Sequence, residues 1–270
     1  MEVHHHTHTA PDPDPSTSLP TGQAGSGHRG RKKWTHYLWE FLMLFLAVFC
    51  GFLAENQREH FVEKHRAKEY AKSLLNDLTG DTIKINAAIQ YAIWAVSMID
   101  TLQQIADSIT NYKTVPGRFY YYSSTATISP FLDWNMTSLN QIINSGNIRY
   151  FKNTELVKKI SDYVRITLVI DEQLDQDRAY RQKSRELRNE VLISRYFSLF
   201  SSPRYQPISD SALKQIYPIQ ATNPGGLENF LNSYQNRKAI LYDLHYNTIP
   251  TSRVIAIQLI ELLKKEFHFK

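Results

Sequence analysis

The sequence is poor in cysteine and lacks the short motifs that mark common classes of enzyme. Cys50 is its one cysteine, so an intramolecular disulfide is excluded and the redox compartment cannot be inferred. The patterns His-Glu-x-x-His and Gly-x-Ser-x-Gly are absent, as are a P-loop and the two paired Glu-x-x-His motifs of di-iron bundles. We therefore assign no catalytic residue and no cofactor.

Long runs of alternating polar and apolar residues are also missing, which argues against a fold based on β-sheet. The net charge of +5 is small, and part of it comes from the basic block Arg29, Arg31, Lys32 and Lys33. Anionic lipid headgroups account for such a block when it precedes a membrane span. The charge therefore gives no reason to expect a nucleic-acid partner.

The sequence does contain a long apolar run, Phe41 to Ala54, which Tyr37, Leu38 and Trp39 extend on the N-terminal side. As a helix, the stretch from Tyr37 to Ala54 measures roughly 27 Å, close to the thickness of a bilayer's hydrocarbon core. Its aromatic residues fit the interface, where an apolar ring carries a hydrated polar atom. We predict a transmembrane helix over residues 34–54, with the lipid bilayer as its partner.

Glu40 is the one charged residue in this segment, and one turn inside the boundary it can stay near the headgroups or become protonated. A secretory signal peptide is the competing interpretation. Cleavage after Ala54 would place Phe52 where a small residue is required, so we expect the anchor to be retained.

The flanks of the span favour a cytoplasmic N-terminus. The basic block before it contains no acidic residue, whereas an equal number of basic residues after it alternate with glutamates: Arg58, Lys64, Arg66 and Lys68. Acidic residues count little in the positive-inside rule, and long domains translocate largely regardless of charge. We therefore predict that residues 55–270 lie on the non-cytoplasmic side.

Within the span, Ala47, Gly51 and Ala54 recur at four- and three-residue spacing on one side of the helix. Small residues allow two helices to approach closely in lipid, where hydrophobic burial gives no driving force. This face predicts a homo-oligomer.

Residues 1–33 are rich in His, Pro and Gly and cannot bury enough apolar surface to fold, so they predict a disordered tail. The tail contains the histidine cluster His4, His5, His6 and His8. These imidazoles are weak candidate metal ligands, because no acidic residue, cysteine or scaffold fixes their geometry. We expect a solvated tail without a metal.

After the span, apolar residues continue at three- and four-residue spacing, the period of one helical face. The first members of the series are Phe61, Ala67, Ala71, Leu74, Leu75 and Leu78, and it continues to Ile109 with only Gly80 lowering the helix propensity. We predict one long helix here, followed by an irregular stretch from Asn111 to Pro130 and a short helix from Met136 to Asn144 that Gly146 ends.

Asn153 is a good N-cap for a second long helix reaching about Phe197. Four prolines make Ser201 to Gly226 a loop with at most one short helix, and a third long helix starts near Leu227, with Pro250 expected to kink or divide it. The fold class is therefore mainly α: one N-terminal transmembrane helix followed by an antiparallel bundle of long helices over residues 55–270.

One face of the predicted second helix carries four arginines, Arg178, Arg181, Arg185 and Arg188. They are candidates for contact with an anion or a partner. The alternative is internal pairing: if this helix returns antiparallel to the first, the arginines come level with Glu69, Asp77 and Asp81. We expect pairing, particularly of Arg185 with Asp81, with further local partners at Asp171, Asp175 and Asp177.

Two weaker patterns also have a structural and a functional interpretation. The aromatic block Phe119 to Tyr122 suggests a ligand platform, but we expect it to cap the open end of the bundle. His60 and Glu63, one turn apart, are too few for a metal site and fit a solvated charged face.

Two parts of the sequence carry a resemblance to known proteins. They are Met1 to His6 with Lys32 to Trp34, Trp39 to Val48 and Gly51 to His60, and then Thr137 to Asn140, Ser145 to Asn147, Lys152 to Leu156 and Ser161 to Tyr163. These segments resemble a family of uncharacterised bacterial single-pass membrane proteins. The resemblance is specific in the first hundred residues and thin beyond about residue 170. It implies a protein of the bacterial inner membrane, and it supplies no catalytic residues. With the orientation predicted from the flanking charges, residues 55–270 would then lie in the periplasm.

The sequence thus predicts a membrane-anchored, non-enzymatic helical protein that binds an unknown protein partner or ligand at the cell envelope. The alternative is an envelope enzyme with an unrecognised polar site in the bundle. A buried, convergent cluster of titratable side chains in a pocket would favour the enzyme.

Overall fold

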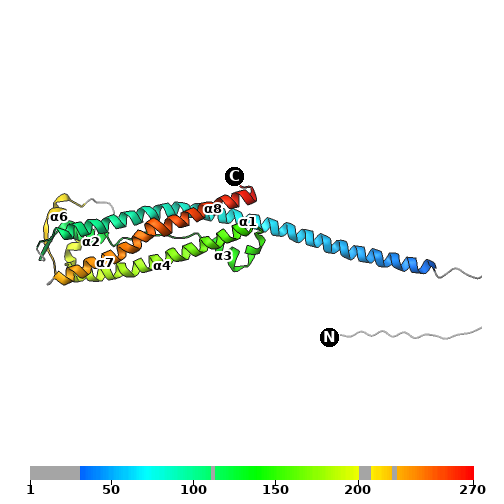
Figure 1. Ribbon diagram of the computed structural model, residues 1–270, viewed down its shortest axis with the longest axis horizontal. Helices are drawn as coiled ribbons and strands as arrows, with labels where there is room; N and C mark the ends of the chain where they lie inside the picture. Colours follow the sequence, from blue (N-terminus) through cyan, green and yellow to red (C-terminus); the bar gives the residue numbers. More distant parts are fainter. Residues whose placement is uncertain (1–30, 111–112, 201–207, 221–223) are drawn as a thin grey trace, which may run out of the picture. The chain divides into compact units, whose positions relative to one another are not determined.

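The computed structural model describes residues 31–110, 113–200, 208–220 and 224–270, and the chain is mainly helical (Figure 1). Its elements are α1 (Arg31–Asp107), β1 (Thr114–Pro116), α2 (Gly117–Thr125), α3 (Thr137–Asn144), η1 (Asn147–Tyr150), α4 (Thr154–Val191), η2 (Ser194–Tyr196), α5 (Phe197–Phe200), α6 (Asp210–Lys214), β2 (Ile216–Pro218), α7 (Pro224–Asp243), η3 (Leu244–Thr248) and α8 (Ile249–Phe267). The chain divides between Arg58 and Glu59 into two units, and the second contains the bundle.

The first unit holds the N-terminal part of α1, a long apolar helix. By length and composition α1 contains one segment able to cross a membrane, and none of that segment is buried. All side chains from Trp34 to Ala54 are exposed, including the large hydrophobic ones.

In the second unit, α1 confirms the predicted helical period. Ala67, Ala71, Leu74 and Leu78 are buried, and the buried series continues at the same spacing to Ile105. Phe61, which we expected on this face, is instead exposed, because it precedes the first residue that the rest of the bundle covers. Gly80 does not interrupt the helix.

The second long helix, α4, begins where the sequence predicted. The side chain of Asn153 accepts hydrogen bonds from the backbone N–H groups of Glu155 and Leu156, and Glu155 adds a favourable charge in the first turn. Gly146 has a φ of 69°, as its predicted role after α3 requires.

The predicted antiparallel order is wrong for α1 and α4. Tyr163, near the start of α4, donates a hydrogen bond to Asp81 of α1. Further along both helices, Asp177 and Asp100 bond to neighbouring residues of α7, Arg237 and Lys238. The helices α1 and α4 are therefore parallel, whereas α7 and α8 run antiparallel to both.

The cause is an irregular segment, residues 126–136, which carries the chain back along the bundle before α3 and α4 begin. Extended backbone of this length spans about 36 Å, close to the rise of about 39 Å from Asp81 to Asp107 in α1. Asn135 fixes its far end by donating its N–H to Asp81, 2.9 Å away, and its Nδ2 to the carbonyl of Asp77. A Cβ at Gly80 would lie 2.8 Å from Asn135 Nδ2, so the Asn135 side chain would have to shift to make room for it.

The third long helix is divided as Pro250 predicts. The π-helical turn η3 joins α7 to α8, and Pro250 occupies the first turn of α8. Because proline has no N–H to donate to the preceding turn, a wider turn just before it accommodates the lost hydrogen bond. Both α7 and α8 pack against α4 (Figure 1).

The aromatic block closes one end of the bundle, as expected, but part of the predicted irregular stretch is helical. Phe119 and Tyr120 lie on α2 and are fully buried. The ring of Tyr120 lies 5.4 Å from that of Phe197 and 5.9 Å from that of Phe200. This end also contains a small antiparallel pair, β1 and β2, which the sequence did not predict because each strand has three residues.

Candidate functional site

The four arginines of α4 do not share one environment. Arg178 donates from Nη1 to Asp175 Oδ1 at 2.7 Å, and both side chains are exposed. Arg181 is half-buried and Arg185 is exposed. Arg188 is half-buried, with its guanidinium carbon 4.5 Å from the centre of the Phe197 ring and its Nε buried without a hydrogen-bond partner among the described residues.

The expected pairing of these arginines with α1 is wrong. Asp81 accepts from Asn135 and Tyr163, Asp77 accepts from the backbone of Ser138, and Glu69 lies 3.3 Å from His65. The parallel direction of α4 explains this, because it places the start of α4, and not the arginines, level with these acids. Of the local acids, Asp175 pairs as predicted, whereas Asp171 accepts from Trp134 Nε1 at 2.9 Å.

Arg178 and Arg181 instead line a cavity of about 410 Å³ between α4 and the segment that runs back along the bundle. Its lining is Ser129, Pro130, Phe131, Leu132, Asp171, Leu174, Asp175, Arg178 and Arg181. The volume lies within the range of small-ligand sites. The lining therefore combines apolar side chains with charged groups of α4.

Arg181 is the charged residue in the lining of this cavity that has no hydrogen bond or ion pair with the described residues. Asp171 and Asp175 are occupied by Trp134 and Arg178, and no hydrogen bond or ion pair joins Arg181 to the other described residues. Burial lowers the pKa of its guanidinium and neighbouring guanidinium groups lower it further, whereas Asp177 opposes them. An anion placed here would relieve both the desolvation and the repulsion between like charges.

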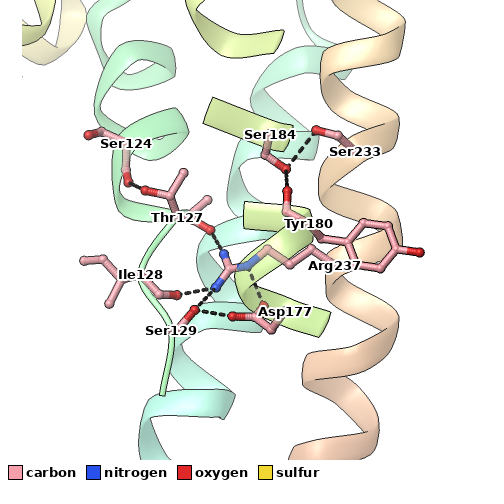
Figure 2. Close-up of polar contacts among 10 residues, drawn as sticks. Ser124, Thr127, Ile128, Ser129, Asp177, Tyr180, Ser184, Ser233 and Arg237 are labelled. Carbon is pink, nitrogen blue, oxygen red and sulfur yellow. Dashed lines mark hydrogen bonds and ion pairs between the residues drawn. The ribbon is translucent and has the colours of Figure 1, made fainter. Parts of the chain in front are cut away.

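A fully buried ion pair holds Ser129, one of the residues that line the cavity (Figure 2). Arg237 of α7 donates from Nε to Asp177 Oδ1 of α4 at 2.7 Å. Its remaining nitrogens donate to the carbonyl oxygens of Ala126 and Ile128 and to Ser129 Oγ, which itself donates to Asp177. The cluster thus ties α7, α4 and residues 126–129 together.

Neighbouring hydroxyls extend this cluster along the contact between α4 and α7. Ser233 Oγ donates to Ser184 Oγ at 2.9 Å, and Ser184 donates to the carbonyl of Tyr180, as Figure 2 shows. Small hydroxyl residues at these positions let the two helices approach closely with their polar atoms satisfied. The cluster is therefore closed by its own hydrogen bonds, which is typical of a structural role.

Sequence reasoning missed Arg237, although a signal for it exists. Leu227, Phe230, Tyr234, Leu241 and Leu244 are buried on one face of α7 and η3. Position 237 completes that three- and four-residue series, so a charged residue stands on the buried face. Such a residue requires a buried partner of opposite charge.

The other candidate residues are placed as follows. His4, His5, His6 and His8 lie outside the described residues. His60 Nδ1 lies 3.8 Å from Glu63 Oε2, and within the described ranges no group of three or more potential ligands could hold a metal. Ala47, Gly51 and Ala54 are exposed.

Comparisons with protein-family models, curated proteins and solved structures give no match to this chain. The functional interpretation therefore depends on the contacts described above.

Proposed function

We propose that this protein is a membrane-anchored, non-enzymatic helical protein that binds an acidic ligand in the cavity lined by Arg178 and Arg181. The observation that carries the proposal is Arg181, a half-buried guanidinium that lines a cavity of about 410 Å³ whose two lining acids, Asp171 and Asp175, are hydrogen-bonded to other residues. Guanidinium forks bind carboxylates and phosphates through two parallel hydrogen bonds.

The cavity also indicates what the rest of the ligand is like. Pro130, Leu132 and Leu174 give it an apolar side, and the Phe131 side chain is 79% exposed beside them. Burying this ring against a ligand would remove apolar area from water, which is favourable at about 25 cal/mol per Å². The ligand we propose is therefore a carboxylate or phosphate attached to an apolar body.

The proposed membrane anchor is residues 34–54 of α1. Its large hydrophobic side chains are exposed along the whole stretch, as lipid contact requires and as burial in a soluble core would not leave them. We retain the resemblance to bacterial single-pass membrane proteins as part of the proposal, with the N-terminus cytoplasmic and the bundle periplasmic.

Protease accessibility tests this placement. Protease added to spheroplasts should degrade the bundle, whereas a cytoplasmic marker protein stays intact. Full protection of the bundle while the inner membrane is sealed would reverse the orientation, and release of the protein by alkaline carbonate would refute the anchor.

Ligand binding is tested with two aromatic acids, phenyl phosphate and benzoate, on the full chain in phosphatidylcholine nanodiscs. We expect the acids to bind and benzyl alcohol, which lacks the charge, not to bind. Arg181→Gln should weaken binding at least tenfold, while Arg165→Gln, an exposed arginine of the same helix paired with Asp162, should leave it unchanged. Equal loss in both variants, or no binding of either acid, would refute the site.

A further inference from the structure

A second cavity, of about 400 Å³, lies where the start of the bundle's part of α1 meets η1 and the end of α8. It is lined by His60, Glu63, Lys64, Ala67, Lys68, Tyr150, Lys152, Glu266, Phe267 and His268. We propose that this cavity binds the phosphate of an anionic phospholipid headgroup. The inference rests on the membrane anchor of the proposed function and is independent of the cavity at Arg181.

The two acids that line the cavity, Glu63 and Glu266, already have partners other than Lys64 and Lys68. Glu63 lies 3.7 Å from Lys152 Nζ and 3.8 Å from His60 Nδ1, so its carboxylate already has a cationic partner in Lys152. Glu266 accepts a hydrogen bond from Asn153 Nδ2 at 3.0 Å.

Lys64 and Lys68 are exposed, lie one turn apart on the same face of α1, and have no acidic partner among the described residues. They supply two positive charges to the lining of the cavity.

The floor of the cavity suits the apolar part of a lipid. Ala67 and Tyr150 are buried beneath the lysines. Phe267 packs against Phe151 with ring centres 5.9 Å apart, and Arg66 donates to the Tyr150 hydroxyl at 3.4 Å. Apolar side chains beside two ammonium groups therefore match a phosphate that carries acyl chains.

The chain itself keeps this cavity close to the bilayer. His60 follows Ala54, the last residue of the proposed span, by so few residues that even fully extended backbone reaches only about 22 Å. A Lys or Arg near an anionic membrane surface is attracted to it electrostatically. Headgroups are thus the phosphates present at high local concentration, which selects a lipid over a free phosphate ester.

The test uses the full chain in nanodiscs of phosphatidylcholine mixed with phosphatidylglycerol, with native mass spectrometry of the lipids retained on release. Wild type should retain phosphatidylglycerol in preference to phosphatidylcholine. Lys64→Gln with Lys68→Gln should lower the retained phosphatidylglycerol at least fivefold, while Lys158→Gln with Lys183→Gln, two exposed lysines of α4, should not change it. Equal retention by wild type and the first double variant would overturn the inference.

Two further measurements separate the sources of failure. In pure phosphatidylcholine nanodiscs, tight binding of soluble glycerol phosphate without any preference for phosphatidylglycerol in mixed nanodiscs would overturn the lipid as the ligand. Flotation with neutral phosphatidylcholine vesicles tests the anchor alone. Absence of flotation refutes the anchor, whereas flotation without a preference for the anionic lipid refutes only this site.

Discussion

Asp81 and Asp177 are buried carboxylates of the bundle, and their partners differ in charge. Asp177 meets the guanidinium of Arg237, whereas Asp81 accepts hydrogen bonds from two neutral donors, the Asn135 N–H and the Tyr163 hydroxyl. A buried charge with a charged partner and one with neutral partners respond differently to substitution and to pH. Both residues hold the segment between α2 and α3 to the helices.

The buried ion pair predicts strong coupling between its two residues. Arg237→Met would leave the Asp177 carboxylate buried without its cation, which should cost about 3 to 5 kcal/mol of unfolding free energy. Arg237→Met combined with Asp177→Leu should cost clearly less than the sum of the two single changes, as measured by urea unfolding. Additive losses would show that the pair is not coupled. Arg165→Met, with its exposed ion pair, is the control and should cost almost nothing.

Asp81 predicts a pH dependence of the opposite sign to that of a salt-bridged carboxylate. Burial raises its pKa above the ordinary value, and the hydrogen bonds from Asn135 and Tyr163 oppose this shift without cancelling it. As pH rises past the unfolded pKa, the unfolded chain releases this proton first, so the group's contribution to stability falls until the folded pKa is passed.

Asp81→Asn should remove this decline, because an amide keeps an acceptor for the Asn135 N–H and stays neutral. Its stability relative to wild type should therefore rise between about pH 4 and neutrality. Asp81→Ala leaves two buried donors without an acceptor and should cost about 1 to 3 kcal/mol. Urea unfolding at several pH values measures both, and a pH-independent difference between Asp81→Asn and wild type would contradict the argument.

At the scale of the elements, local signals in the sequence predicted the helices well. The apolar period of α1, the Asn153 cap, the left-handed Gly146 and the division near Pro250 are each set by residues close in sequence. The direction of α4 could not be predicted in this way. It depends on hydrogen bonds between Asn135 and residues of α1 more than fifty positions earlier, and Asn135 has no local feature that marks it.

The candidate cavity could likewise be predicted only in part, because some of its features depend on residues far apart in sequence. The sequence identified its arginines from their helical spacing, but it could not show that Arg178 and Arg181 face Phe131, which belongs to the irregular segment. It also assigned Asp177 to the arginines of α4, whereas the partner is Arg237 of α7. Local spacing defines a face of a helix, and only the path of the connecting segments decides what covers that face.

Gly117 lies at the aromatic end of the bundle, where the neighbouring residues leave no room for a side chain. Its N–H donates to the Gln215 carbonyl at 2.8 Å, and an added Cβ would meet the carbonyl oxygen of Ala212 as well as the rings of Phe200 and Tyr217. Although alanine is the better helix former, Gly117→Ala should destabilise the protein by about 1 to 3 kcal/mol through overpacking. Arg118→Ala, an exposed neighbour on α2, is the control for thermal unfolding and should have little effect.

At the scale of the whole molecule, a single proposed span anchors a bundle whose core is filled by its own helices. The core lies within the unit that begins at Glu59, and its buried residues come from α1, α4, α7 and α8 as well as from the aromatic end. The bundle therefore does not need the span for its packing. This leaves the surface of the span available for lipid or for a second helix.

We predict that two copies of the whole molecule associate through the span. Ala47, Gly51 and Ala54 lie on one side of α1, and a Cβ at Gly51 would have no heavy atom within 4 Å among its possible neighbours. A second copy could therefore approach this face closely, which is the main source of helix association in lipid. Gly51→Ile should reduce the signal in a membrane two-hybrid assay, because its branched side chain separates the two backbones. Phe49→Ile changes the opposite side of the helix and should leave the signal intact, so equal signals from wild type and both variants would remove this face as a contact between copies.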